Sequence, residues 1–562
     1  MHRKIEGYDE STVVTSPRTK RVFEIPDSLF QGLKEHLVGR HVSNGIALLN
    51  AHAQLFHSLD PAQPNAARFV GSVAQWVDIG YRDPELLRQL LERFPTAMRS
   101  RLPVGDYLHL HMAEGLYALL RDEPDDALVH FDLVLSMEGE IEDKEVVAIA
   151  HFWNGRCHRK KGEYDVALKQ TLLGRELAGN LGFERMAAVM RVLESWLHFQ
   201  KGNRREASRI LDKAEQSLRD TDDDITLGNI YSAHGRMVRR QGRYNEALRF
   251  FTTAIEHYQK RNPQHRNLAR SLTNIAYVQR LAALEISRQM DAESARRRKT
   301  GAASPTGSSR KKGHWEKYEQ LRADAFANLE QAEKIYRHHH HHHGIGNIYE
   351  NRGLLYRDTG DLDSAAAQAA LAYSVGREEN DAIVMARSRL LQCSIERAKL
   401  EEEIEGSTGG WDHLQAARDY ARDAVEAARH TQNQRLLARA YIWRGLIACS
   451  SNDMDDAKHC CDTATSFLKS VDYDELWEEL QLLKQKVVPK GNIDPLLRSW
   501  SQGVTGDKTF QQMTEQFAEL VIPRVWEKEE KKISRVATRL SISPKKVRRI
   551  LTRLGKIGNR GN

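Results

Sequence analysis

The stretch GNIYSAHGRMVRRQGRYNEA, residues 228–247, decides the fold of this chain. It returns as GNIYENRGLLYRDTGDLDSA at residues 346–365, with glycines at the same three positions and the same final alanine. The third glycine, Gly242 or Gly360, stands where one helix is expected to end and the chain to turn into the next. Each stretch therefore predicts two helices joined by a short turn.

The final alanine of each stretch belongs to a series spaced by 40 residues. Its members are Ala127, Ala167, Ala207 and Ala247, then Ala325 and Ala365, then Ala417 and Ala457. Small or apolar residues mostly follow each alanine at spacings of four and seven, which places them on one helix face. Twelve positions before the alanine there is usually another small residue, which allows two helix backbones to approach closely. These residues are Gly115, Gly155, Ser195, Gly235, Gly353 and Gly445.

This pattern resembles the tetratricopeptide repeat, in a variety of about forty residues. The resemblance covers about residues 101–470 and implies an all-α protein with a right-handed α-solenoid over residues 101–487. Propeller repeats have a similar period, but they need short strands, whereas these units have helical spacing. Upstream, residues 26–100 keep the register with larger side chains, which predicts a degenerate helical cap.

We expect the cap to form helices over residues 28–58, 66–80 and 83–94, after a disordered N-terminus at residues 1–25. Two insertions interrupt the repeat register, near residues 288–314 and near residues 403–411. The first is rich in Arg, Lys, Gly and Ser and is expected to be a mobile basic loop, because such a composition cannot build a core. The second is expected to be a shorter surface turn.

The first helix of each pair lines the concave face of such a solenoid. The register projects nine polar residues onto this groove: Arg156, Arg159, Lys160, Asn229, Arg236, Arg239, Arg240, Asn347 and Arg357. A basic groove with asparagines that hydrogen-bond a peptide backbone fits a protein or peptide partner, acidic or phosphorylated. The alternative is a solvated polar face with nothing bound.

Charge is distributed unevenly along the chain. The formal net charge is +7, but residues 531–562 contain eleven basic and no acidic residues, which leaves −4 for the remainder. A basic tip on a mildly acidic body is typical of proteins that bind phosphate, in nucleic acid or on an acidic membrane surface. A solvated basic tail is the alternative interpretation.

The C-terminal residues 507–562 follow a linker expected over residues 488–506. Residues 533–540 predict a short helix, and Ser541 and Ile542 predict a turn. Ser543 as N-cap and Pro544 at the first helical position then start a second helix. This helix is expected to bury Val547, Ile550, Leu551 and Leu554 and to stop at Gly555. The spacing is typical of a helix-turn-helix.

These residues resemble the Fis-type DNA-binding module of many bacterial transcription activators, with Ser541 where that family usually has glycine. The resemblance implies that the outward face of the second helix binds DNA, with help from two arginines of the first. The residues concerned are Ser543, Lys545, Lys546, Arg548, Arg549, Thr552, Arg553, Arg535 and Arg539. The alternative is a small basic helical cap on the solenoid.

In the Fis family the preceding helix forms a dimer. The corresponding stripe here is Phe510, Met513, Phe517 and Leu520, so a homodimer through residues 510–521 is implied, in a helix that Pro523 is expected to kink.

No cofactor and no enzyme activity are expected, because the motifs GxSxG, GxxxxGK[ST] and HExxH are absent. The run His338–His343 is interpreted as an inter-repeat turn rather than a metal site, and Cys449, His459, Cys460 and Cys461 as core rather than zinc ligands. No apolar run approaches the about 20 residues that span a bilayer, so we expect a cytoplasmic protein without a membrane partner. The leading hypothesis is a DNA-binding, transcriptional regulator, and the rival is an interaction scaffold without nucleic-acid binding.

Overall fold

The computed structural model describes residues 25–300, 306–406, 411–469, 475–487 and 509–557. Every regular element in these ranges is a helix, as the repeat pattern predicts. The disordered terminus expected over residues 1–25 and the linker expected over residues 488–506 lie outside these ranges, apart from residue 25. Within them, no helix is both long enough and apolar enough to cross a membrane.

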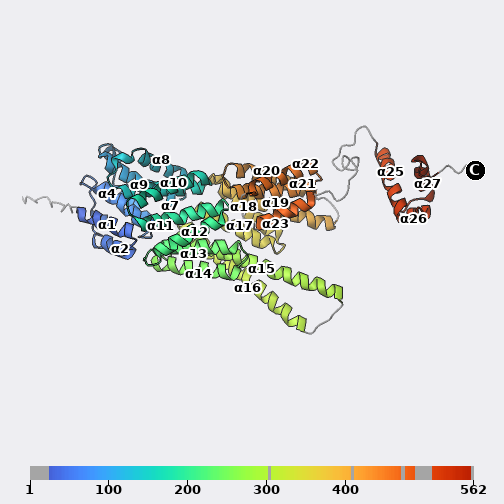
Figure 1. Cartoon of the computed structure of the whole chain (residues 1–562), viewed down its shortest axis with the longest axis horizontal. Helices are drawn as coiled ribbons and strands as arrows, with labels where there is room; N and C mark the ends of the chain where they lie inside the picture. Colours follow the sequence, from blue (N-terminus) through green and yellow to red (C-terminus); the bar gives the residue numbers. More distant parts are fainter. Residues whose placement is uncertain (1–24, 301–305, 407–410, 470–474, 488–508, 558–562) are drawn as a thin grey trace, which may run out of the picture.

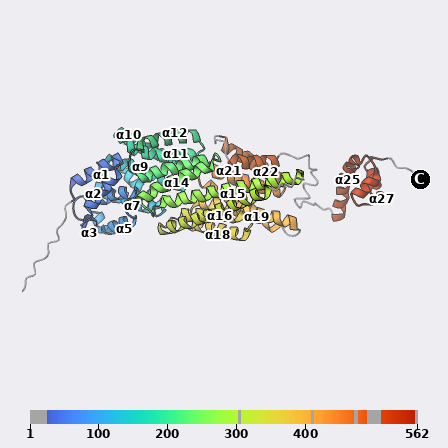
Figure 2. The same cartoon turned by 90° about the horizontal axis from the view of Figure 1, so that it is seen from below.

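Within the described ranges, eight helix pairs form the solenoid, and the two helices of each pair pack on each other (Figures 1 and 2). The first three pairs are α7 (Val104–Leu120) with α8 (Pro124–Ser136), α9 (Lys144–Lys161) with α10 (Tyr164–Asn180), and α11 (Glu184–Gln200) with α12 (Arg204–Leu218). The next three are α13 (Asp224–Arg239) with α14 (Tyr244–Arg261), α15 (Arg266–Thr300) with α16 (Thr306–His338), and α17 (His342–Arg357) with α18 (Leu362–Glu378). The last two are α19 (Ala382–Gly406) with α20 (Trp411–Arg429) and α21 (Gln434–Ser450) with α22 (Met454–Leu468), and α23 (Glu475–Val487) packs on that last pair.

The small residues of the register lie where paired helices cross. All eight alanines of the series are fully buried, at 0 % exposure. A Cβ atom at Gly115 would lie 2.6 Å from the Phe131 ring, and one at Gly235 would lie 2.8 Å from the Phe251 ring. The aromatic ring four residues after the alanine therefore occupies the space that the glycine leaves open. The close approach of paired helices that the small residues predict is therefore confirmed at these two glycines.

The N-terminal cap is a set of short helices. They are α1 (Asp27–Gly39), α2 (Val42–Ala51), α3 (Leu55–Ser58), α4 (Ala66–Asp78), α5 (Glu85–Leu91) and α6 (Thr96–Arg99). The single helix expected over residues 28–58 is wrong, because Arg40 adopts a left-handed conformation (φ 54°) and ends α1. The Arg40 guanidinium forms a buried ion pair with Asp223, at 3.1 Å between Nε and Oδ2, which fixes this break.

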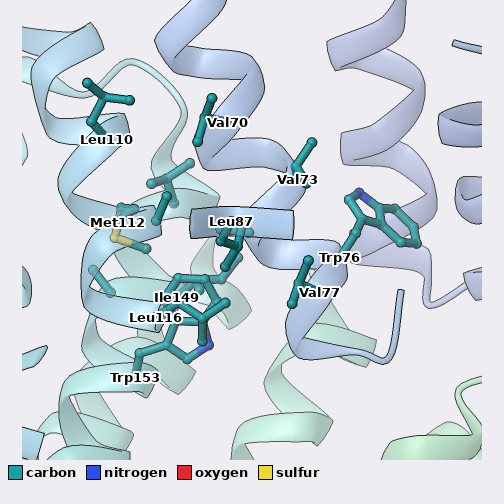
Figure 3. Packing of buried hydrophobic residues seen from close by; sticks show 14 of the residues in the cluster. Val70, Val73, Trp76, Val77, Leu87, Leu110, Met112, Leu116, Ile149 and Trp153 are labelled. Carbon is teal, nitrogen blue, oxygen red and sulfur yellow. The ribbon is translucent and has the colours of Figure 1, made fainter. Parts of the chain in front are cut away.

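The cap shares its core with the first repeats. Figure 3 shows Val70, Val73 and Val77 of α4 beside Leu87, and facing Leu110, Met112 and Leu116 of α7 and Ile149 and Trp153 of α9. The Trp153 indole N–H also donates to Asp78 at the end of α4, at 2.9 Å. The cap is therefore continuous with the solenoid.

Both insertions lengthen helices instead of forming the expected loops. α15 continues to Thr300 and α16 begins at Thr306, so the mobile loop expected over residues 288–314 is wrong for residues 288–300 and 306–314. Residues 301–305 lie outside the described ranges. Figure 1 shows α15 and α16 extending beyond the other helices. Residues 288–299 are mostly good helix formers, and buried Ala283, Ile286 and Tyr318 join the two helices beyond the repeat core.

The second insertion behaves in the same way. α19 reaches Gly406 and α20 starts at Trp411, so the turn expected over residues 403–411 is wrong for residues 403–406 and 411. Residues 407–410 lie outside the described ranges.

Inter-helix turns that are far apart in the sequence contact one another, along a row of contacts that we call the seam. Val42 N–H donates to Asp222 at 2.6 Å, His343 N–H donates to Asp122 at 2.9 Å, and Gln432 N–H donates to the Gly162 carbonyl at 2.9 Å. Asn433 also donates to the Tyr164 hydroxyl at 3.2 Å. These contacts join segments that are far apart in the sequence, so successive turns of the superhelix touch along the seam.

The C-terminal unit contains α25 (Phe510–Lys528), α26 (Ile533–Arg539) and α27 (Pro544–Arg553). Its buried core is made by Ile522, Trp526, Val536, Ala537, Val547, Ile550 and Leu551. The Ser543 hydroxyl caps α27 by accepting from Lys546 N–H, with Pro544 at the first position. Leu554 does not join the buried stripe as expected: it is 39 % exposed, because α27 ends at Arg553.

The turn between α26 and α27 takes the form for which glycine is usually required. Ser541 has φ 51°, the left-handed region, and Ile542 N–H donates to the Ala537 carbonyl at 3.0 Å. α25 continues as one helix through Pro523.

Candidate functional site

Four arginines face one another, and they belong to the first helices of three helix pairs. We call them the arginine cluster. They are Arg159 of α9, Arg236 of α13, and Arg266 and Arg270 of α15, all half-buried. Burial, followed by repulsion from the neighbouring guanidinium groups, lowers the pKa of Arg159 and of Arg236 to about 9 and that of Arg266 to about 10. The fold therefore holds several positive charges close together in a partly desolvated place.

Within the part of the chain that the structure describes, these four guanidinium groups form no ion pair with a carboxylate. Arg159 lies over the Trp196 ring, 5.2 Å from its centroid, and Arg236 donates to the Ser232 hydroxyl at 3.0 Å. Asp78 and Asp122 act on Arg266 only through their charges. The buried Nε atoms of Arg236 and Arg270 have no hydrogen-bond partner among the described residues. Buried donors of this kind are costly unless an acceptor reaches them.

In each copy of the Gly-Asn-Ile-Tyr motif, the asparagine binds an arginine from the first helix of the next pair. Asn229 Oδ1 accepts from Arg270 Nη2 at 2.7 Å, and Asn347 Oδ1 accepts from Arg387 Nη1 at 2.9 Å. Asn229 Oδ1 also accepts from Tyr258 and Asn267, at 2.9 and 3.0 Å. The two asparagines that the sequence assigned to a peptide backbone thus position guanidinium groups through their oxygens.

Two predicted groove cations are neutralised inside the protein. Arg156 binds Asp78 at 2.6 Å, and Lys160 forms an ion pair with Asp122. Burial alone would raise the pKa of Asp78, but the charge of Arg156 holds it below its usual value. These pairs tie α9 to the end of α4 and to the turn after α7.

The remaining predicted groove cations contact neighbouring helices. Arg239 donates to Asn274 at 3.3 Å, Arg240 donates to the Phe199 carbonyl at 3.1 Å, and Arg357 donates to the Ser394 hydroxyl at 3.0 Å. Of the nine predicted groove residues, the structure brings Arg159, Arg236 and Asn229 into or beside the arginine cluster. The binding role of all nine remains a prediction.

Sequence reasoning missed Arg266 and Arg270. Both lie in the first turns of α15, and the 40-residue register leads from Thr226 to Arg266. The groove positions Asn229, Arg236 and Arg240 lead in this register to Ala269, Ala276 and Arg280. Arg266 and Arg270 correspond instead to Thr226 and Ile230, which are buried, so the register does not predict them.

The C-terminal unit presents cations on α27. Lys545 and Arg548 are exposed and Lys546 is half-buried, and within the described residues none of the three forms an ion pair. The Ser543 hydroxyl is occupied by its cap, and Thr552 is half-buried.

Four other predicted DNA-binding arginines have carboxylate partners. Arg549 pairs with Glu515 at 2.6 Å, and Arg553 pairs with Glu515 and Glu519. Arg535 pairs with Glu530 at 2.9 Å, and Arg539 pairs with Glu529. These acidic residues of the α25 region, which sequence reasoning did not consider, neutralise part of the basic face. The arginines of these pairs are 49–62 % exposed, so the pairs are weak.

The apolar stripe expected to form a dimer lies on α25. Phe510 is 81 % and Phe517 48 % exposed, while Met513 and Leu520 are half-buried. The stripe is therefore only partly covered within the C-terminal unit.

The histidine run forms the turn between α16 and α17, and its side chains have specific contacts. His341 Nδ1 lies 3.4 Å from Asp122, His343 Nδ1 lies 2.6 Å from Asp381, and His338 Nε2 lies 3.3 Å from Asp83. The run therefore contains the predicted inter-repeat turn, and this turn is part of the seam. Cys460 and Cys461 are buried in the core beneath α23, and Cys449 is half-buried.

Comparison with known proteins gives one family match. A tetratricopeptide repeat model matches residues 226–299, from α13 almost to the end of α15. No curated protein matches the sequence.

Solved structures with similar helical arrangements have low sequence identity. A Rap protein complexed with competence and sporulation factor is 12 % identical, covering 82 % of this chain and 98 % of that chain, with a TM-score of 0.45. The apo quorum sensor NprR from B. thuringiensis is 12 % identical, covering 71 % and 98 %, with a TM-score of 0.44. The Rap conjugation gene regulator of plasmid pLS20, in complex with the Phr* peptide, is 12 % identical, covering 72 % and 96 %, with a TM-score of 0.40.

Proposed function

We propose that this chain is a two-part regulator, whose solenoid binds an acidic peptide segment of a partner and whose C-terminal unit binds DNA. The observation that supports the first part is the arginine cluster, whose guanidinium groups form no ion pair within the described residues. Carboxylates placed among these groups would form charge-assisted hydrogen bonds in a partly desolvated site. They would also relieve the repulsion among the cations.

An extended ligand suits this cluster better than a single small ion. Arg159, Arg236 and Arg266 come from three different helices, so one ligand that contacts all three must span them. A chain with several acidic side chains meets this requirement. The first helices of stacked pairs are the surfaces with which such solenoids bind extended segments.

A direct test uses fluorescence anisotropy of labelled probes with the full-length chain. We expect a short glutamate-rich peptide to bind with an affinity that falls as salt rises, because the contacts are ionic. A peptide with glutamine in place of every glutamate should not bind. Equal binding of both peptides, or of neither, would overturn the proposal. A single-stranded RNA that displaces the acidic peptide would assign the cluster to nucleic acid instead.

The DNA-binding part rests on Lys545, Lys546 and Arg548, which have no ion-pair partner within the described residues, and on the resemblance to Fis-type modules. Cations near the start of a helix after a turn are positioned to contact DNA bases and phosphates. The turn at Ser541 and the buried side of α27 are compatible with such a role.

Salt-titrated DNA binding of the full-length chain tests this part. Replacing Lys545, Lys546 and Arg548 together by alanine should weaken binding and reduce the salt slope by roughly one for each lost phosphate contact. A control that replaces the solenoid cations Arg209, Lys213 and Lys334 removes the same charge and should change neither. If the wild-type chain shows no salt-dependent DNA binding, the rival function of an interaction scaffold without nucleic-acid binding is the correct one.

A further inference from the structure

Two imidazoles and one carboxylate converge in the first helix pair of the solenoid. His111 and Glu114 lie one turn apart on α7, and His130 lies on α8. The Nδ1 atoms of His111 and His130 are 2.7 Å apart, and Glu114 Oε2 lies 3.5 and 3.4 Å from them. The three side chains are 13 %, 25 % and 15 % exposed for His111, His130 and Glu114. The cluster is shielded but still reachable from solvent.

The cluster has ligand atoms with lone pairs directed at one another. The Nδ1 atoms of His111 and His130 are at hydrogen-bond distance, so at least one of them has no proton and offers a lone pair. Arg99 forms an ion pair with Oε1 of Glu114, which leaves Oε2 directed at the imidazoles. A partner on the distal oxygen of this kind is how proteins orient carboxylate ligands.

The next repeat shows that helix packing does not need this residue set. At the same register, 40 residues later, stand His151, Asn154 and Gln170. There His151 Nδ1 and Gln170 Oε1 form a 2.7 Å hydrogen bond between α9 and α10. An amide thus satisfies the same histidine, whereas the first repeat has a second imidazole and a carboxylate.

We propose that His111, Glu114 and His130 bind a divalent transition-metal ion, zinc above all, which joins α7 to α8. Two nitrogen ligands and one oxygen ligand with a fourth position open to water form a common zinc coordination set. Tetrahedral coordination at about 2.0–2.1 Å places two ligand nitrogens about 3.3 Å apart. The two Nδ1 atoms, now 2.7 Å apart, would need to separate by about 0.6 Å.

A second cluster, Asp212, Glu215 and His234, provides an internal control. It has a single imidazole, and His234 Nε2 already forms a 2.9 Å hydrogen bond with Glu215 Oε2. Asp212 is exposed. One imidazole and two oxygens suit zinc less well than two imidazoles and one oxygen.

Metal titrations of the full-length chain test the proposal, with zinc measured by competition against a chromophoric chelator and cobalt by its visible spectrum. His130→Gln is the decisive variant, because it reproduces the residue of the next repeat and keeps a hydrogen bond to His111. The histidine run is present in every variant, so its contribution cancels in the comparison.

We expect wild type to bind one more equivalent of zinc than His130→Gln, and to give a tetrahedral cobalt spectrum that the variant lacks. His234→Gln should behave as wild type. Identical stoichiometry, affinity and cobalt spectra for wild type and His130→Gln would overturn the proposal. If His130→Gln loses its helical circular dichroism, Glu114→Gln decides: a loss of at least about tenfold in zinc affinity supports the site, and unchanged affinity contradicts it.

Discussion

The amide oxygen of Asn229 accepts a 2.7 Å hydrogen bond from Arg270 Nη2, and through this contact α13 fixes a guanidinium of α15 within the arginine cluster. The second copy of the motif makes the equivalent contact between Asn347 and Arg387. The motif that identified the repeat in the sequence therefore also positions positive charge. Its asparagine is uncharged, so it holds the arginine without neutralising it.

Asn229→Asp tests this relationship. The new carboxylate would keep the shape of the side chain and form an ion pair with Arg270, so the local positive charge would fall. We expect the affinity for a glutamate-rich peptide to drop at least about tenfold, which is about 1.4 kcal/mol. The thermal midpoint should stay the same or rise. Anisotropy and thermal melts measure both, and a variant that binds the peptide as wild type does would show that Arg270 takes no part.

Stability should fall in mildly acidic solution. Burial lowers the pKa of His265 to about 3 and that of His109 to about 4, so the folded chain keeps both neutral. The unfolded chain binds protons on both imidazoles below about pH 6.5. The free energy of unfolding therefore falls by on the order of 1.4 kcal/mol for each pH unit and each histidine. His343 acts in the opposite sense. Burial alone would lower its pKa, but Asp381 raises it, so the contribution of His343 to stability is present at low pH and is lost as pH rises.

Denaturant midpoints at pH 7 and pH 5 measure the balance, and we expect the lower value at pH 5. His265 lies near Arg266, Arg270, His339 and Asp78, and its Nδ1 accepts from Asn267 N–H at 3.3 Å. His265→Asn offers an oxygen for that N–H and should reduce the difference between the two pH values. An unchanged difference would assign the acid sensitivity to other groups.

Close helix packing makes Gly235 intolerant of a side chain. A Cβ atom there would lie 2.8 Å from the Phe251 ring, which is enclosed by the core. We expect Gly235→Ala to lower the free energy of unfolding by about 1–3 kcal/mol. Gly179 of α10 has no atom within 4 Å of such a Cβ, so Gly179→Ala should instead stabilise by up to about 1 kcal/mol. Urea unfolding distinguishes the two, and equal effects would contradict the packing account.

The acidic residues of α25 are expected to restrain DNA binding. Glu515 and Glu519 neutralise Arg549 and Arg553, two of the predicted DNA contacts. Replacing both glutamates by glutamine should raise DNA affinity and steepen its salt dependence, because two more cations become available to phosphate. Salt-titrated DNA binding of the full-length chain measures both quantities.

The matched control for this double variant lies on the solenoid. Glu402 of α19 and Glu426 of α20 are exposed, and their replacement by glutamine removes the same two negative charges away from α27. The control should leave the DNA affinity close to that of wild type. If the α25 double variant binds DNA no better than this control, the carboxylates do not restrain the basic face.

The sequence predicted the helix pairs because their packing is local and periodic. Ala127 and Gly115 belong to neighbouring helices, and a short turn suffices to bring these helices together. The same locality predicted the cap at Ser543 and the buried side of α27 from Val547 to Leu551. Each of these features depends on residues within one or two helices.

Features that depend on the path of the whole superhelix could not be predicted in this way. The His343 N–H bond to Asp122 joins residues 221 positions apart, and it exists only because the repeats curve back on themselves. The break at Arg40 depends in the same way on distant Asp223. The basic, polar composition near residues 288–314 predicts a loop, but α15 and α16 continue there, because Ala283, Ile286 and Tyr318 extend the packing between them.

The most direct test of the central claim, that the arginine cluster binds an acidic ligand, is calorimetric titration of a glutamate-rich peptide into two matched double variants. One replaces Arg159 and Arg236 by glutamine, and the other replaces Arg209 and Arg243, which are both 55 % exposed and paired with glutamates. Both lose two positive charges. We predict that the first loses at least about tenfold in affinity and that the second changes by less than about twofold, because exposed charges are screened. Equal losses in both variants, or none in either, would contradict the account.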